Sequence, residues 1–233
     1  MKTGLYILLF ILIAFINSFG QLKVGADLYS RYIWRGLDFG DAPAFQPSLT
    51  YTSGGFSIGA WGSYAFPTAG TTYSENDLWL SYSLATETSG CFSVVLTDYY
   101  LPSAGIPFGY YKPGTNISAA HTIEGGLSYS GPESFPVTIA FYTNLSNDRD
   151  NSTYIQAGYP FSVSDATITL GAGLVPSRSS YYLTDKVNFI NLSLTAAKSV
   201  QITDKFALPI SASYIANPAL DKTYLAFGVS LVF

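Results

Sequence analysis

The side chains with the clearest capacity for chemistry are charged residues that share one face of otherwise apolar segments. Lys23, Asp27 and Arg31 are spaced four positions apart, and the residues directly beside Asp27 are apolar. Successive side chains of a β-strand point to opposite faces, so this spacing places all three on one face. Charges of both signs on one face can pair with each other or line a path for polar solutes.

No arrangement of residues indicates catalysis. The single histidine, His121, shares a face with Ile123 and Leu127, and no serine motif marks a nucleophile for it. The single cysteine, Cys91, is expected to be a small packed residue. Because no spacing is typical of metal ligands or of a phosphate-binding loop, we expect no enzyme activity, no cofactor and no metal.

The N-terminus is typical of a secretory signal. Lys2 precedes an apolar run over residues 5–19, which is shorter than the roughly 20 residues that a membrane-spanning helix needs. Ser18 and Gly20 are small residues at the positions that signal cleavage requires. We expect a signal peptide at residues 1–20 and one mature domain at residues 21–233; an uncleaved anchor helix is the alternative.

The composition indicates a chain whose surface faces lipid. Hydrophobic residues make up 48% of the sequence and charged residues only 11%, against about 25% in soluble domains. No later window has the length of a spanning helix, so a closed sheet must satisfy the backbone. The formal charge of −4, without a basic cluster, makes nucleic acid an unexpected partner.

Apolar side chains then fall on every second position in segments of about ten residues. In the last segment, Leu225, Phe227 and Val229 alternate with Ala226 and Gly228, as in a strand with one apolar face. The pattern predicts an all-β, transmembrane, antiparallel up-and-down β-barrel of about twelve strands. The expected strands are 22–32, 44–52, 55–65, 75–85, 90–100, 119–130, 135–146, 152–161, 166–175, 186–199, 205–216 and 222–233.

The connections support this count, because short turns alternate with longer segments as in bacterial outer-membrane barrels. The expected turns are 52–55, 86–90, 130–134, 162–165 and 200–204, and the longer segments include 33–43, 66–74, 101–118 and 176–185. Both termini then lie on the periplasmic side. Aromatic residues are expected to form girdles at both membrane interfaces; the outer one would hold Tyr32, Trp34, Tyr64, Phe66, Tyr99, Tyr100, Tyr110, Tyr111, Tyr142, Tyr181, Tyr182 and Tyr214.

These observations predict a protein of the bacterial outer membrane, with membrane lipid as its surroundings. The final Phe233 is expected to be recognised by the outer-membrane assembly machinery. A soluble barrel, with its apolar face turned inward, is the alternative.

The first strands resemble a known family. Residues 25–85 carry this likeness, and they are similar to the TorF-type porin family, whose function is not settled. The similar segments are DLYSRYIWRG at residues 27–36, PAFQPSLTY at 43–51, GFSIGAWGS at 55–63 and ENDL at 75–78. The resemblance implies a porin-like barrel, and the aromatic segment 99–111 departs from the family pattern.

Inside such a barrel, charges must face away from lipid, since an arginine on the lipid side costs about 2 to 4 kcal/mol near mid-bilayer. Arg31 could also pair with Asp27 or Glu124 and brace the barrel. We expect Arg35 and Asp38 at the pore mouth. The residues expected to line the interior are Lys23, Asp27, Arg31, Asp77, Trp79 and Glu124.

Two functions remain open. The first is a porin-like channel for passive diffusion of small polar solutes, because twelve strands lie between the filled eight-stranded barrels and the open channels of about sixteen. The second is a closed barrel that acts as a structural, adhesive or receptor protein.

Overall fold

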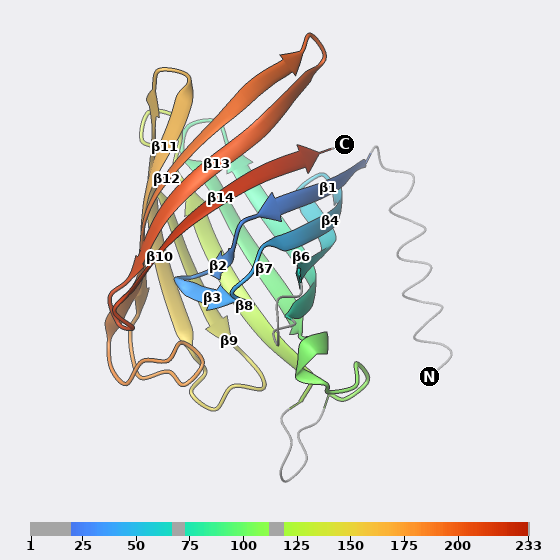
Figure 1. Ribbon diagram of the computed structural model, residues 1–233, viewed down its shortest axis with the longest axis vertical. Coiled ribbons are helices and arrows are strands. Elements are labelled where there is room, and N and C mark those ends of the chain that lie inside the picture. Colours follow the sequence, from blue (N-terminus) through green and yellow to red (C-terminus); the bar gives the residue numbers. More distant parts are fainter. Residues whose placement is uncertain (1–19, 67–72, 112–118, 233) are drawn as a thin grey trace.

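The chain forms a closed antiparallel β-barrel. A computed structural model describes residues 20–66, 73–111 and 119–232. Twelve strands close into one barrel in which each strand pairs with the next, and β1 pairs with β14 (Figure 1). This confirms the expected number and order of strands. In the described residues, no helix is both long and apolar enough to cross a membrane.

The strand bounds agree closely with the sequence pattern. The barrel strands are β1 (Gln21–Tyr29), β4 (Ala44–Ser53), β5 (Phe56–Ala65), β6 (Ser74–Thr86), β7 (Gly90–Tyr100), β8 (His121–Ser130), β9 (Thr138–Asn144), β10 (Thr153–Val163), β11 (Ala166–Val175), β12 (Asn188–Thr203), β13 (Phe206–Asn217) and β14 (Lys222–Val232).

Three expected boundaries are wrong by three or more residues. Strand β1 was expected to reach residue 32, but it ends at Tyr29. Residues 200–203 were expected in a turn, but they continue β12 and pair with β13. Strand β9 begins at Thr138 rather than at residue 135, since Pro136 has no N–H to donate to a neighbouring strand.

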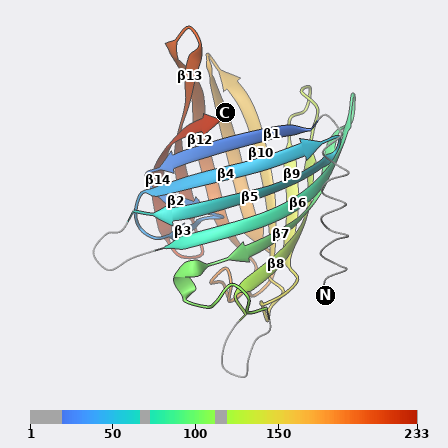
Figure 2. The same cartoon turned by 90° about the vertical axis from the view of Figure 1, so that its right-hand side faces the viewer.

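The two ends of the barrel differ in their connections. The start of β1 and the end of β14 lie at one end, here called the terminal end, where mostly short turns join the strands (Figures 1 and 2). The longer connections gather at the opposite end, here called the loop end. The expected signal peptide and the final Phe233 lie outside the described residues.

The outer face of the barrel is apolar. Large hydrophobic side chains alternate along the strands with partly buried ones, and many are about half exposed. Leu225 and Phe227 are 58% and 54% exposed, whereas Ala226 between them is 7% exposed. This arrangement is the reverse of the soluble alternative, in which the apolar face would be turned inward.

An additional hairpin occupies part of the interior. Strands β2 (Tyr32–Trp34) and β3 (Leu37–Phe39) follow β1 and precede β4 in the chain, and they form a separate two-stranded sheet (Figure 1). Its side chains contact residues of β7, β8 and β12 on the inner wall. The sequence pattern predicted a long connection at residues 33–43, and the segment does connect β1 to β4, but the pattern did not predict that it folds into a hairpin inside the barrel.

A bulge changes one expected face. The alternation of Ile190, Leu192 and Leu194 in the sequence predicts that all three face outward, but the register between β11 and β12 shifts at Gly173 and Leu174. The extra residue leaves Phe189 48% exposed outside and Ile190 fully buried.

Several members of the expected outer girdle also point elsewhere. Tyr64, Phe66 and Tyr214 are well exposed, as a girdle requires. Tyr32, Tyr99 and Tyr182 are instead buried in the interior.

Candidate functional site

The tip of the β2–β3 hairpin carries an arginine into the barrel. A two-residue turn, Arg35 and Gly36, joins the strands, and both residues have positive φ, 51° and 78°. Such turns match the twist of a hairpin, but positive φ is uncommon for a residue other than glycine. The contacts of Arg35 offset this local cost and fix the side chain.

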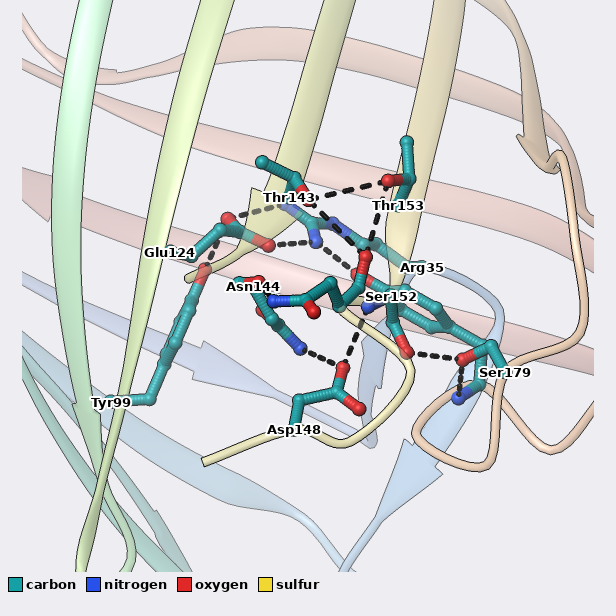
Figure 3. Close-up of polar contacts among 11 residues, drawn as sticks. Arg35, Tyr99, Glu124, Thr143, Asn144, Asp148, Ser152, Thr153 and Ser179 are labelled. Atoms are coloured by element: carbon teal, nitrogen blue, oxygen red, sulfur yellow. Dashed lines mark hydrogen bonds and ion pairs between the residues drawn. The ribbon is translucent and has the colours of Figure 1, made fainter. Parts of the chain in front are cut away.

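The guanidinium of Arg35 forms a two-pronged ion pair with Glu124 on β8. Its Nη1 and Nη2 donate to the two carboxylate oxygens at 2.5 and 2.9 Å (Figure 3). The Tyr99 hydroxyl donates to the same carboxylate at 2.9 Å. Glu124 and Arg35 are 2% and 8% exposed, so the pair is shielded from water and strengthened by its surroundings.

Aromatic rings enclose the rest of the guanidinium. The Cζ atom of Arg35 lies 4.3 Å from the ring centres of Trp34 and Tyr142 and 4.7 Å from that of Tyr154. Its Nη1 also donates to the Tyr182 hydroxyl. Burial raises the pKa of Tyr182, so this hydroxyl stays neutral and can accept the bond.

The backbone of the hairpin tip is fixed as well. Asn217, at the end of β13, donates from Nδ2 to the carbonyl of Gly36 at 3.0 Å. A Cβ at residue 36 would lie 1.8 Å from the Ile190 carbonyl oxygen, so only glycine permits this approach. The hairpin therefore reaches from the β1–β4 side of the barrel to β12 and β13.

Apolar packing completes the closure at the loop end. The buried cluster of the protein lies here, where residues of the hairpin pack against strands β10, β11 and β12 and the connection 176–187. Its members are Leu37, Tyr154, Val175, Tyr182 and Ile190. We call the hairpin, residues 32–39, together with the side chains that pack against it, the plug.

The half of the interior toward the terminal end has a different lining. Small hydroxyl side chains face each other across neighbouring strands, as in the pairs Ser83–Ser93 and Thr195–Ser213, 2.8 and 2.9 Å apart. Their partial exposure indicates a space that solvent can enter. The other inner-face residues of this kind are Ser57, Ser81, Ser128, Ser193 and Ser211.

An acidic pair lies beside the plug on β6. Glu75 and Asp77 are 6% and 7% exposed and share the inner face of the strand. The Tyr73 hydroxyl donates to Glu75 at 2.8 Å. In the described part of the chain, no donor reaches Asp77 Oδ1, although this atom is buried.

The remaining residues expected in the interior occupy varied positions. Asp27 lies opposite Gln46 on the inner face, and the Trp79 ring covers Gly59 so closely that a Cβ there would be 2.5 Å away. Lys23 is exposed near the terminal end.

The first long connection contains its own ion pairs. Arg31 pairs with Asp38 at 3.3 Å and with Asp41. The alternative in which Arg31 pairs with Asp27 or Glu124 is therefore wrong. Arg35, expected at the mouth, is buried in the plug.

Comparison with known proteins gives one match. A family model described as "Bacterial protein of unknown function (Gcw_chp)" matches residues 17–230, which is nearly the whole barrel. The chain belongs to this family. No curated protein matches it.

In this Gcw_chp protein, two connections at the loop end are locked together beside the plug. Asp148 accepts hydrogen bonds from Asn144 Nδ2 and from the backbone N–H of Ser152, at 2.9 and 2.8 Å (Figure 3). The hydroxyls of Ser152 and Ser179 are 2.6 Å apart. Burial tends to raise the pKa of Asp148, but the bonds from Ser152 and Asn144 outweigh it and leave this pKa below its usual value.

The single histidine of the Gcw_chp protein anchors another connection on the outer face. His121 Nδ1 lies 2.8 Å from an Asp98 carboxylate oxygen, and Nε2 lies 2.6 Å from the Phe108 carbonyl oxygen. Rings of Tyr100 and Tyr111 stack on the imidazole, 5.2 and 4.1 Å away. Because the carbonyl occupies Nε2, the histidine is not presented to a nucleophile as in a catalytic triad.

Proposed function

We propose that this protein is a channel of the bacterial outer membrane for small polar solutes, closed by the plug in the state described here. The loop end faces the outside of the cell, and the hydroxyl-lined half opens to the periplasm. The observation that carries the proposal is the contrast inside one barrel between a polar, partly accessible half and a half filled by a connecting hairpin.

The outer face supports the membrane location. Its half-exposed hydrophobic side chains include Leu49, Leu80 and Leu170 in the middle of the strands. Soluble proteins rarely expose a continuous apolar belt of this extent, whereas lipid tails cover it without cost.

The construction of the plug supports gating. Its tip is held by one ion pair, two polar bonds and ring contacts, whereas the barrel strands are joined by continuous ladders of hydrogen bonds. The hairpin can therefore leave the interior, which opens the channel, while the ring of paired strands stays intact. The resemblance of residues 25–85 to the TorF-type porins agrees with this proposal.

Liposome swelling tests the proposal. The mature protein, residues 21–233, is refolded into vesicles, which are diluted into glycerol, arabinose or sucrose. We expect slow entry of the two smaller solutes for the natural chain and entry at least about tenfold faster for Arg35→Ala, since an unpaired buried Glu124 destabilises the plug. Arg149→Ala, which removes an exposed arginine at the same end, is the control and should leave the rate unchanged.

A closed barrel with a structural or receptor role is the second candidate. The fully buried Tyr154, Tyr182 and Ile190 favour it, because they seal the loop end as tightly as a protein core. Vesicles that stay impermeable with both the natural chain and the Arg35→Ala variant, while both are folded, would contradict the channel and support this candidate.

A further inference from the structure

The acidic pair on β6 has no counter-charge within the described residues. Arg35 is engaged by Glu124, and Arg31 by Asp38 and Asp41. No described lysine or arginine forms an ion pair with Glu75 or Asp77.

The lack of a counter-charge matters because Glu75 and Asp77 are both buried. Taking a carboxylate out of water costs several kcal/mol unless a charge or hydrogen bonds compensate. Glu75 receives the bond from Tyr73, but Asp77 Oδ1 receives none in the described chain. A bound group that carries positive charge and donates hydrogen bonds would supply both the missing counter-charge and the missing hydrogen bond to Asp77 Oδ1.

Aromatic residues flank Asp77 on both neighbouring strands. In the strand register, Trp61 of β5 and Tyr99 of β7 lie directly opposite Asp77. Residues in this relation point to the same face with Cβ atoms about 5 Å apart. The Tyr32 ring extends the aromatic wall, with its centre 5.5 Å from that of Trp61. Carboxylates among aromatic rings are the usual surroundings of an organic cation.

We propose that Asp77 and Glu75, with the rings of Trp61 and Tyr99, form a binding subsite for the primary ammonium group of a small solute. An ammonium has three N–H donors, which suit Asp77 Oδ1 and the carboxylate of Glu75. A metal ion fits less well, because in the described residues no group of three or more His, Cys, Asp or Glu is arranged to hold one.

The subsite deepens the proposed function and rests on it, since it lies on the solute path beside the plug. It selects amines among small polar solutes. Entry of an amine would also place a positive charge close to the Arg35–Glu124 pair.

Calorimetric titration of the detergent-folded chain with propylammonium chloride tests the subsite at constant ionic strength. We expect saturable binding that is about tenfold weaker in Asp77→Asn, as for loss of a hydrogen bond to a charged group. Asp204→Asn, in an exposed turn at the terminal end, is the matched control and should bind like the natural chain. Tetramethylammonium, which has no N–H, should bind at least about tenfold more weakly than propylammonium.

A second variant tests the subsite in case Asp77→Asn does not fold. Trp61→Leu retains both carboxylates and should also weaken binding by removing the cation–π contact. The subsite is wrong if the natural chain gives no saturable heat, if both variants bind like the control, or if tetramethylammonium binds as well as propylammonium.

This titration needs no transport, so the two proposals can fail separately. A chain that binds propylammonium but leaves vesicles impermeable contradicts the channel and supports the subsite. A chain that admits solutes but shows no specific binding contradicts the subsite alone.

Discussion

Arg35 and Glu124 are 89 positions apart in the sequence, yet they form the two-pronged ion pair that holds the plug. Arg35 lies on a connection between neighbouring strands, whereas Glu124 lies on the barrel wall. The pair therefore joins the hairpin to the barrel wall.

Removing one partner should destabilise the protein strongly. We expect Arg35→Ala to lower the free energy of unfolding by about 3 kcal/mol, because Glu124 then stays buried without its counter-charge. Urea titration of the lipid-folded barrel measures this difference.

The double variant Arg35→Met/Glu124→Gln separates lost pairing from lost packing. Its loss of stability should be smaller than the sum of the two single losses by more than about 1 kcal/mol, since no unpaired charge remains. Additive losses would show that the two side chains act independently.

Gly36→Ala should displace the hairpin. The new Cβ would lie 1.8 Å from the Ile190 carbonyl oxygen, which is part of a strand and cannot give way easily. Gly105 has a similar φ of 72° with no neighbouring atom within 4 Å, so Gly105→Ala is a matched control. We expect a cost of about 1 to 2 kcal/mol in the control from backbone strain alone, and a larger loss for Gly36→Ala. Equal losses would mean that the close approach to Ile190 does not matter.

Asp148→Asn should loosen the locked connections at the loop end. The variant retains the shape of the side chain but weakens the bonds from Ser152 and Asn144. Trypsin should then cleave after Arg149 several-fold faster than in the natural chain. Asp185→Asn, in the neighbouring connection, is the control, and equal cleavage of the two variants would contradict this role of Asp148.

The same residue gives a pH dependence. The pKa of Asp148 is lower in the folded chain than its unfolded value of about 3.9, so its stabilising effect is fully present above that value and is lost as the pH falls through the folded pKa. The midpoint of the pH-dependent shift of the Asp150 and Ser152 amide resonances should therefore lie below about pH 3.9. A midpoint above that pH would contradict the lowered pKa.

His121→Ala should release the connection that follows β7. The variant loses the bonds to Asp98 and to the Phe108 carbonyl, together with the stacked rings of Tyr100 and Tyr111. We expect faster chymotrypsin cleavage at Phe108 with an intact barrel. Leu127→Ala, on the same face of β8, should leave the connection resistant; similar cleavage in both variants would show that His121 is not the anchor.

The strand count could be predicted because each strand has one apolar face, on the outside of the barrel, and one inner face of smaller or more polar residues. Alternation in segments such as Leu225–Phe227 depends only on that division, and the strands follow it almost residue by residue. The same alternation also predicts which residues lie on the inner face, as it does for Asp77 and Glu124.

The plug could not be predicted by the same reasoning. Tyr32, Trp34, Leu37 and Phe39 alternate as a hairpin would, and Arg35–Gly36 occupies the turn, but this pattern does not say on which side of the sheet the hairpin folds. Interior aromatics resemble interfacial ones in sequence, and the bulge at Ile190 lies where Gly36 of the distant hairpin approaches β12. Long-range contacts decide these features.

Single-channel conductance in a planar bilayer tests the plug most directly. The natural chain and the Arg35→Ala variant are compared at the same voltage and salt concentration. We expect rare, short openings of the natural chain and long-lived openings of the same unit conductance in the variant, because Arg35 lies on the hairpin, so the barrel wall is unchanged and only the ion pair that holds the hairpin is lost. A folded variant as silent as the natural chain, or one that opens no more often, would contradict the proposal that the hairpin closes a channel.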